Sequence, residues 1–299
     1  MTALPSLKQL QYLVALDEQL NFTRAAESCF VTQSTLSAGL KELEDVLGAR
    51  LVERDRQTVL MTPLGLEIAR RARDVLAATR DLAELAACTA EPMSGPLRLG
   101  IIPTIAPFLL PHSMTLLRDR YPGLRLSLRE DLTANLIARL DDGQLDFALI
   151  ALPYATGNLL VETLFNDPLW IVGRTGDPEI KAKTVNPIPA LTERLLLLEE
   201  GHCLREHALQ ACGNANRQAP GNMEATSLLT LIQMVESGLG IALVPEMAVN
   251  SGLTKSPGLV SRPLSKPSPS RTIALVARRS TSRLVEMKAL GEVIREACL

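Results

Sequence analysis

The sequence lacks an excess of charge of either sign. Its 31 Lys and Arg residues nearly balance 33 Asp and Glu residues, for a formal net charge of −2. A chain that binds nucleic acid through its overall charge is strongly basic, so this balance excludes binding of that kind. Any contact with nucleic acid must therefore use positive charge that is concentrated in one part of the chain.

A membrane-spanning run and a secretory signal are also missing. The uncharged stretch 99–117 is long enough to suggest a span, but it contains Pro103, Pro107 and Pro111, which would break a helix in lipid. The first ten residues hold one lysine and no apolar segment, so we expect no secretory signal. We predict a cytoplasmic protein with no membrane partner.

Cysteine occurs in an odd number and without a metal-binding pattern. The five residues, at positions 29, 88, 203, 212 and 298, form no C-x-x-C pair and no zinc spacing. In a reducing compartment they are expected to be thiols. Any disulfide among them would be transient and would serve a chemical reaction, not the stability of the fold. His112 and His207 add no ligand geometry, so we predict neither a metal nor a cofactor.

The length and composition predict a globular protein of more than one domain. A single core rarely grows beyond about 250 to 300 residues, and this chain has 299. Its hydrophobic content of 46% excludes a disordered chain. The run PMSGP closes a long helical segment and is the clearest linker. We predict a reading domain over residues 1–62, a linker helix over 63–91 and a regulatory domain over 92–299.

Helical periodicity dominates the first of these parts. Apolar residues fall at helical spacing over 7–20, and Thr23 is expected to cap a short helix that ends at Cys29. A third helix should begin after the N-cap Thr32 and stop at Gly48. Helix, tight turn and helix form the outline of a DNA-reading element.

A hairpin and a long helix should follow. Strand-like segments 51–53 and 58–61 flank a polar turn, which predicts a wing. Thr62 and Pro63 then form a cap and a first-turn proline at the start of a helix that reaches about residue 90. The apolar stripe of this helix consists of Leu64, Ile68, Val75, Leu82 and Leu85. Alone it would face water, so we expect the helix to pair with a second copy.

The last part alternates strand-like and helical segments. The strand-like runs are 97–102, 124–128, 147–151, 169–172, 195–198, 241–244 and 272–277. Helical stretches over 132–141 and 227–236 lie between them. This alternation implies α/β layers, and about 200 residues with a midway crossover fit two similar lobes around a cleft.

A family resemblance is carried by residues 21–54, NFTRAAESCFVTQSTLSAGLKELEDVLGARLVER. They resemble the winged helix-turn-helix of LysR-type transcriptional regulators, and the resemblance extends through the linker helix to the end of the chain. It implies an α/β regulatory domain of two lobes, similar to periplasmic-binding proteins. It also implies that the third helix enters the major groove. The DNA contacts would come from Thr32, Gln33, Ser34, Thr35, Ser37, Lys41, Arg54 and Arg56.

The chemistry of these side chains suits DNA, but the local charge does not. Glutamine can pair bidentately with adenine, and short hydroxyls bond to base edges or phosphates. Residues 1–66, however, hold six basic against eight acidic residues. Acids such as Glu42, Glu44 and Asp45 must therefore lie away from DNA while Lys41 faces it. The alternative is that these residues are only the solvated faces of a small helical domain.

A second resemblance narrows the match. Residues 195–212, LLLLEEGHCLREHALQAC, resemble the redox segment of the OxyR regulators, the peroxide-sensing branch of the family. Residues 101–111, IIPTIAPFLLP, are similar to the first cleft loop of that branch. The resemblance implies that Cys203 attacks hydrogen peroxide and that Cys212 resolves the product. The peroxide pocket would then contain Thr104, Thr133, His202 and Arg271.

Physical chemistry agrees with these roles. Attack on peroxide needs a thiolate, and we expect the start of a helix, His202 and a nearby arginine to favour the anion at Cys203. A sulfenic acid would form and condense with a second thiol. Nine helical residues separate the Cα atoms of Cys203 and Cys212 by about 13 Å, whereas a disulfide tolerates about 4.4 to 6.8 Å. The segment must therefore unravel or loop back before the bond can form, and the lobes that pack against it must repack.

These features together predict a transcriptional regulator and not an enzyme. The expected partners are promoter DNA, hydrogen peroxide, RNA polymerase and further copies of the chain, as a dimer through the linker helix and a tetramer as the family implies. One alternative is a regulator whose cleft binds a small organic effector, with Cys203 a bystander. A thiol peroxidase and a solute-binding protein are alternatives of another class. Cys29, Cys88 and Cys298 are expected to have no sensing role.

Overall fold

The structure, a computed structural model, describes residues 4–54, 59–87, 92–186, 193–213 and 224–298. Contacts divide the chain into two compact units. The first comprises residues 1–89 with 141–144, and the second comprises residues 90–140 with 145–299. No helix in the described part of the chain is both long and apolar enough to cross a membrane.

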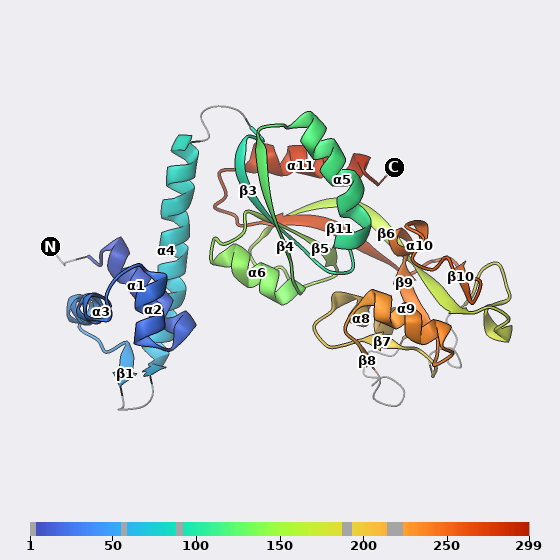
Figure 1. Ribbon diagram of the computed structural model, residues 1–299, viewed down its shortest axis with the longest axis horizontal. Helices are drawn as coiled ribbons and strands as arrows, with labels where there is room; N and C mark the ends of the chain where they lie inside the picture. The colour runs from blue at the N-terminus through green and yellow to red at the C-terminus, as the bar shows by residue number, and fades with distance from the viewer. Residues whose placement is uncertain (1–3, 55–58, 88–91, 187–192, 214–223, 299) are drawn as a thin grey trace. The chain divides into compact units, whose positions relative to one another are not determined.

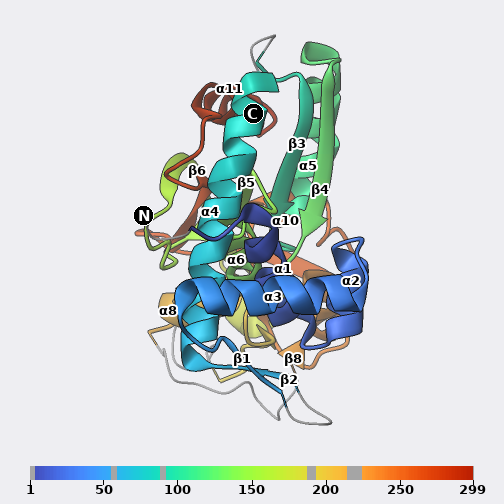
Figure 2. The ribbon, with the colours of Figure 1, turned by 90° about the vertical axis from the view of Figure 1, so that its left-hand side faces the viewer.

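The first unit is a winged helix-turn-helix followed by a long helix. Its elements are α1 (Leu7–Gln19), α2 (Phe22–Ser28), α3 (Gln33–Leu47), β1 (Val52–Arg54), β2 (Val59–Met61) and α4 (Pro63–Ala87). Antiparallel pairing of Val52 with Met61 and of Arg54 with Val59 forms the predicted hairpin. Figure 2 shows α3 along its length, with the β1–β2 hairpin beside it.

Local capping explains where these helices begin and end. Thr32 caps α3 by accepting the N–H of Thr35, and α3 ends at Gly48, whose φ of 64° is the left-handed conformation that glycine adopts without strain; both predictions are confirmed. The predicted cap of α2 is wrong. Asn21, and not Thr23, caps α2, because the side-chain oxygen of Asn21 accepts the N–H groups of Thr23 and Arg24.

The apolar stripe of α4 is uncovered in the single chain. Leu64, Val75 and Leu82 remain 48%, 47% and 72% exposed, while Ile68 is half-buried. The side chain of Leu85 lies outside the described residues. The opposite face of α4 packs Ala69, Ala72 and Leu76 into the core of the reading domain. A row of exposed leucine and valine side chains is costly in water, so this observation supports pairing with a second copy.

The second unit is built on one mixed sheet. Its strand order is β10-β6-β11-β5-β3-β4, with β9 paired to β6. The strands are β3 (Gly95–Ile101), β4 (Leu124–Glu130), β5 (Phe147–Leu152), β6 (Leu160–Arg174), β7 (Leu197–Leu198), β8 (Glu224–Ala225), β9 (Ala242–Pro245), β10 (Leu259–Pro263) and β11 (Ser270–Ala277). Each of the seven predicted strand-like runs overlaps one of these strands, while β8 and β10 were not anticipated.

The helices of this unit cover the sheet. They are α5 (Ala106–Arg120), α6 (Thr133–Asp141), η1 (Pro178–Ile180), α8 (Cys203–Ala211), α9 (Leu228–Glu236), α10 (Glu246–Asn250) and α11 (Leu284–Glu296). The two predicted helical stretches correspond to α6 and α9. Ser227 caps α9 by accepting the N–H of Thr230.

Two separate cores confirm the expected two lobes. The first core is centred on β3, β5, β11 and α11, and the second on the end of β6, β9 and α9. Strand β6 joins them, because its first half pairs with β11 and its second half, from Leu169 onward, pairs with β9 and β10. Figure 1 shows β6 running from the first lobe into the second. Residues 160–174 therefore form one of the crossings between the lobes.

The proline-containing stretch 99–117 is divided between a strand, a turn and a helix. The strand β3 ends at Ile101, and Pro103 lies in the turn that follows. Pro107 stands in the first turn of α5, where its missing N–H is not needed. Pro111 lies inside α5, which continues through it to Arg120. The expectation concerned a helix in lipid, and α5 does not test it.

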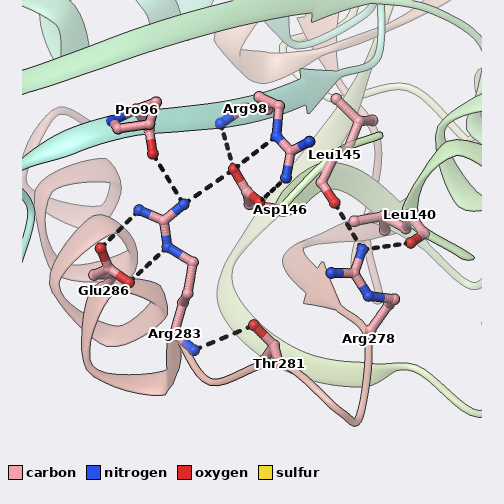
Figure 3. Close-up of polar contacts among 9 residues, drawn as sticks. All are labelled: Pro96, Arg98, Leu140, Leu145, Asp146, Arg278, Thr281, Arg283 and Glu286. Carbon is pink, nitrogen blue, oxygen red and sulfur yellow. Dashed lines mark hydrogen bonds and ion pairs between the residues drawn. The ribbon is translucent and has the colours of Figure 1, made fainter. Parts of the chain in front are cut away.

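A buried ionic network fastens α11 to the first lobe (Figure 3). The guanidinium of Arg283 donates to both carboxylate oxygens of Glu286 at 2.7 Å and also contacts Asp146 at 3.2 Å. Asp146 in turn accepts from the backbone and the guanidinium of Arg98. A further bond from Arg283 to the carbonyl of Pro96 reaches the start of β3. Two arginines thus face two carboxylates where the sheet meets the last helix.

Candidate functional site

The amino end of α3 exposes a cluster of short polar side chains. Thr32, Gln33, Ser34 and Thr35 are all exposed, and Ser37 is half-buried. The Thr32 hydroxyl lies 2.9 Å from that of Ser34 and 2.8 Å from that of Thr35. The structure therefore holds four of the predicted DNA-reading residues together on one helix end, with their orientation fixed by the cap.

A groove of about 590 Å³ runs beside this helix end. Ser34, Ser37 and Lys41 of α3 line it together with Arg50, which precedes the first strand of the wing. Sequence reasoning did not select Arg50 as a DNA contact. Its position just before a predicted wing strand was the available signal, since a cation there adds to the charge of Lys41.

The acidic residues of α3 are used inside the domain. One oxygen of Glu44 accepts the N–H groups of Leu51 and Val52, at 2.7 and 3.1 Å, and so fixes the start of the wing. Glu42 accepts from the amide of Gln9 on α1. The expectation that Glu44 lies away from DNA stays a prediction: its carboxylate is bonded to the wing backbone, although Glu44 lines the same groove as Lys41.

The remaining predicted DNA contacts belong to the wing. Arg54 ends β1, where its backbone pairs with Val59. The side chain of Arg54 and the whole of Arg56 lie outside the described residues.

The second candidate site surrounds Cys203. Cys203 is the first residue of α8, with His202 at the N-cap, and it is 6% exposed. It packs into the core of the first lobe, whereas Cys212, at the C-cap of α8, packs against the core of the second lobe. Both are free thiols. The nine-residue separation along a helix, about 13 Å, is therefore present as predicted, and the two sulfurs belong to different cores.

A fully buried arginine organises this site. Arg271 of β11 donates to the hydroxyl of Thr104 at 2.7 Å and to the carbonyl of Thr104 at 2.9 Å. Its Nε donates to Asp167 of β6 at 3.0 Å, and the nitrogen that donates to the Thr104 carbonyl also lies 3.7 Å from the sulfur of Met247. Arg271 is 0% exposed, so its charge acts without screening by water.

Burial decides the state of the Cys203 thiol. Loss of solvent raises the pKa of Cys203 above its ordinary range, and this effect outweighs four opposing ones. The positive charge of Arg271, the hydroxyl of Thr133 and the backbone N–H groups of Cys203 and Leu204 all lower that pKa. The expected field that favours the anion is thus present, but the expectation that it prevails is wrong in this conformation.

His202 and Thr133 have different surroundings from those expected. The ring of His202 lies 3.9 Å from a carboxylate oxygen of Glu199, and burial lowers the pKa of His202, so this imidazole is neutral near pH 7 and adds no positive charge beside the thiol. The hydroxyl of Thr133 is buried close to Cys203, but among the described residues no partner meets it with hydrogen-bond geometry. That hydroxyl can therefore bond to a molecule that enters the site.

Two neighbours of the site were not anticipated. Asp167 is the only charged residue in the apolar stretch 163–173 of β6, a signal that pointed to a buried partner. His207 lies one turn beyond Cys203 on α8 and is 5% exposed. Its Nε2 bonds to the carbonyl of Pro153 at 3.2 Å, so Nε2 carries the proton and Nδ1, which has no partner among the described residues, does not.

The remaining cysteines lie elsewhere. Cys29 is half-buried against the core of the reading domain, Cys298 is exposed, and Cys88 lies outside the described residues. Within the described ranges, no group of three or more His, Cys, Asp or Glu side chains is placed to hold a metal ion.

The fold and these two sites define a class of protein: a transcriptional regulator that joins a winged helix-turn-helix to a two-lobed α/β domain. Residues 7–66 match the bacterial regulatory helix-turn-helix protein of the lysR family, and residues 90–299 match the LysR substrate binding domain. The chain belongs to the LysR family of transcriptional regulators.

Individual relatives place it beside the OxyR regulators. It is 44% identical over 297 residues to the HTH-type transcriptional regulator EstR of Acinetobacter baylyi, covering 99% of this chain and 98% of that protein. It is 40% identical over 290 residues to the DNA-binding transcriptional dual regulator OxyR of Escherichia coli K12, covering 97% and 95%.

Solved structures give the same result. A cysteine-to-aspartate variant of full-length OxyR from Pseudomonas aeruginosa is 36% identical, with a TM-score of 0.78 and coverage of 98% of both chains. A cysteine-to-serine variant of Corynebacterium glutamicum OxyR with hydrogen peroxide bound is 32% identical, with a TM-score of 0.65 and coverage of 99% of this chain and 95% of that one.

Proposed function

We propose that this regulator responds to hydrogen peroxide through Cys203 and Cys212. The observation that carries the proposal is the setting of Cys203, at the start of α8 beside a buried arginine and a buried hydroxyl that has no partner with hydrogen-bond geometry among the described residues. The likeness to OxyR structures, one of them with hydrogen peroxide bound, supports it. Thr104, Thr133, His202 and Arg271 would form the pocket that holds peroxide.

The chemistry consists of two balanced steps. The Cys203 thiolate attacks one oxygen of hydrogen peroxide, the O–O bond breaks, and hydroxide leaves as Cys203 becomes a sulfenic acid. The Cys212 thiol then attacks that sulfur, water leaves, and a disulfide forms. Hydrogen peroxide is the oxidant, and both cysteines are oxidised. Because Cys203 is protonated in the buried state, the first step should accelerate as pH rises.

The second step supplies the switch. Cys203 and Cys212 pack into different cores and are held apart by α8, so the bond requires α8 to unravel and both cores to repack. In a dimer joined through α4, or in a tetramer, such repacking would change the spacing of the reading domains. A dimeric reader is sensitive to half-site spacing, so oxidation would alter promoter binding and the recruitment of RNA polymerase.

Promoter DNA would be read by α3 and the wing. The proposed contacts are Thr32, Gln33, Ser34, Thr35, Ser37, Lys41, Arg54 and Arg56, with Arg50 added by the groove. Bacterial promoters lie in the cytoplasm, and the proposal places the protein there.

A mass-spectrometric experiment tests the proposal. The native protein is treated briefly with one equivalent of hydrogen peroxide, alkylated and digested. We expect a Cys203–Cys212 crosslink in the wild type and in the matched control Cys29→Ser, and none in Cys203→Ser. A footprint on the promoter before and after the same pulse should change in the first two proteins only. Absence of the crosslink in native wild type would contradict the proposal.

The 44% identity to EstR, a regulator with a different name, supports a second candidate function. In that case a small organic effector would bind between the lobes, and Cys203 would be a bystander. A footprint that responds to an effector and is unchanged in Cys203→Ser would establish this candidate. Rapid turnover of peroxide without promoter binding would instead indicate a thiol peroxidase, and tight solute binding without promoter binding would indicate a solute-binding protein.

A further inference from the structure

A cavity of about 250 Å³ lies outside the Cys203 site, at the crossing between the two lobes. We call it the hinge pocket and define it by Phe108, Phe165, Asp167, Glu246 and Cys298. These residues come from α5 and the end of the chain in the first lobe, from β6 where it crosses, and from α10 in the second lobe. A ligand in this pocket would touch both lobes at once.

Asp167 forms a wall between the hinge pocket and the Cys203 site. One of its oxygens accepts from Arg271 at 3.0 Å, and the other accepts the backbone N–H of Met247 at 3.1 Å. Each carboxylate oxygen can accept two bonds, so Asp167 can still receive a donor from the pocket side. Partial burial of the thiol and, to a smaller extent, the negative charge of Asp167 raise the pKa of Cys298, which lines the same pocket, to about 11.

The lining of the pocket favours one class of ligand. Two carboxylates, Asp167 and Glu246, line it together with two aromatic rings, Phe108 and Phe165, and the imidazole of His112. None of the described residues that line it is a lysine or an arginine. Carboxylates bind ammonium groups, and aromatic rings attract cations and pack against apolar groups. The volume is slightly below the range of about 300 to 1,000 Å³ that drug-sized ligands occupy, so the ligand must be small.

We propose that the hinge pocket binds a small organic ammonium compound with an apolar body, and that this ligand increases the reactivity of Cys203. The ammonium group shares the Asp167 carboxylate with Arg271. Less of the arginine charge is then neutralised at Asp167, and more of its positive field acts on the Cys203 sulfur, which Arg271 already influences. The coupling passes through one ion pair and needs no movement of the lobes.

Benzylamine is a suitable probe, with benzyl alcohol and benzoate as controls of similar shape. The full-length reduced protein is titrated with each compound while its melting temperature and the rate of Cys203 alkylation by iodoacetamide are measured. We expect benzylamine to raise the melting temperature in a saturable way and to accelerate alkylation severalfold. Benzyl alcohol should act only at much higher concentration, and benzoate should not act.

Two variants locate the effect. Glu246→Gln should weaken benzylamine binding at least fivefold, since the amide can still accept from Trp170 but carries no charge. The exposed Glu292→Gln on α11 removes the same charge elsewhere and should leave the titration unchanged. Equal responses to benzylamine and benzyl alcohol, or no effect of Glu246→Gln, would overturn the ligand assignment. Binding without faster alkylation would overturn the coupling.

This test is independent of peroxide. Alkylation by iodoacetamide reports the Cys203 thiolate and requires neither oxidation nor Cys212. If no peroxide-induced crosslink forms, the peroxide proposal fails, but the benzylamine titration still tests ligand binding in the hinge pocket. If the titration fails while the crosslink forms, only the hinge pocket is refuted.

Discussion

Arg271 and Arg283 are both buried in the first lobe, but they differ in the number of carboxylates that they contact. Arg283 faces Glu286 and Asp146, with Arg98 sharing Asp146, so two cations meet two carboxylates (Figure 3). Arg271 has one carboxylate partner, Asp167, and gives its other bonds to neutral groups, the oxygens of Thr104 and the sulfur of Met247. Arg283 thus contacts two carboxylates, which stabilises packing, whereas Arg271 contacts one carboxylate and keeps a positive field on its other side.

The position of each arginine relative to Cys203 completes the comparison. Arg271 lowers the pKa of Cys203 against the larger effect of burial, while Arg283 is not among the groups that shift it. Arg283 holds α11 to the start of β3. The comparison predicts that removing Arg283 changes stability alone, and that removing Arg271 changes stability and chemistry together.

The largest expected effect is that of Arg283→Met. It leaves Glu286 without its bidentate partner and Asp146 with one cation fewer, so the free energy of unfolding should fall by about 3 to 5 kcal/mol. Urea denaturation measures this loss. Cys203 alkylation in the folded fraction should keep the wild-type rate. The exposed neighbour Arg279→Met should change stability by no more than about 0.5 kcal/mol. A loss below about 1 kcal/mol for Arg283→Met would contradict the claim that the Arg283 network stabilises the fold.

Arg271→Gln should show both effects. The amide can still donate to Asp167, so we expect a loss near the lower end for a broken buried pair, about 3 kcal/mol. The pKa of Cys203 should rise further, and a rise of one unit would slow alkylation about tenfold at neutral pH. The pH profile of alkylation in the folded protein measures this. An unchanged profile would show that Arg271 is as purely structural as Arg283.

Two threonines at the site compare a hydroxyl that has a hydrogen-bond partner with one that has none in the described structure. Thr104→Val removes the hydroxyl that accepts from Arg271 and leaves a buried donor unmet, which should cost about 1 to 3 kcal/mol. Thr133→Val removes a buried hydroxyl that has no hydrogen-bond partner in the described structure, so stability should stay equal or rise slightly. Urea denaturation of both variants gives the order, and a larger loss for Thr133→Val would reverse the assignment.

The smallest effect concerns pH. The folded-state pKa of Cys203 is raised, so the folded protein holds this proton above the unfolded pKa of about 8.5. The resulting stability is complete below that pH and is lost as pH rises from there toward the folded pKa, by at most about 1.4 kcal/mol per unit. Melting curves of the wild type between pH 7 and 10 should therefore decline more steeply than those of Cys203→Ser. Parallel curves would show that burial does not hold the proton.

Local signals predicted much of the fold. The cap at Thr32, the stop at Gly48 and the strand-like runs depend on residues within a few positions of one another, and the structure has them as expected. Where two local signals competed, the prediction failed. Asn21 and Thr23 are both good caps, and the side chain of Asn21, two positions before Thr23, accepts from two N–H groups.

The candidate site was predictable only in part. Cys203 and Cys212 could be identified from one segment through its resemblance to OxyR regulators, and helical spacing gave the separation of their Cα atoms. Asp167 could not be assigned a role, since its partner Arg271 is 104 positions away and the pairing depends on how β6 meets β11. The groove position of Glu44 likewise depends on where the wing folds back against α3.

The order of amino acids alone determined the helices, their caps, the exposed stripe on the linker and the distance between the two cysteines, because these follow from backbone geometry over short stretches. Tertiary structure decided which charges surround Cys203 and that loss of solvent dominates its protonation. A pKa depends on burial and on neighbours from distant strands, and neither exists until the chain has folded.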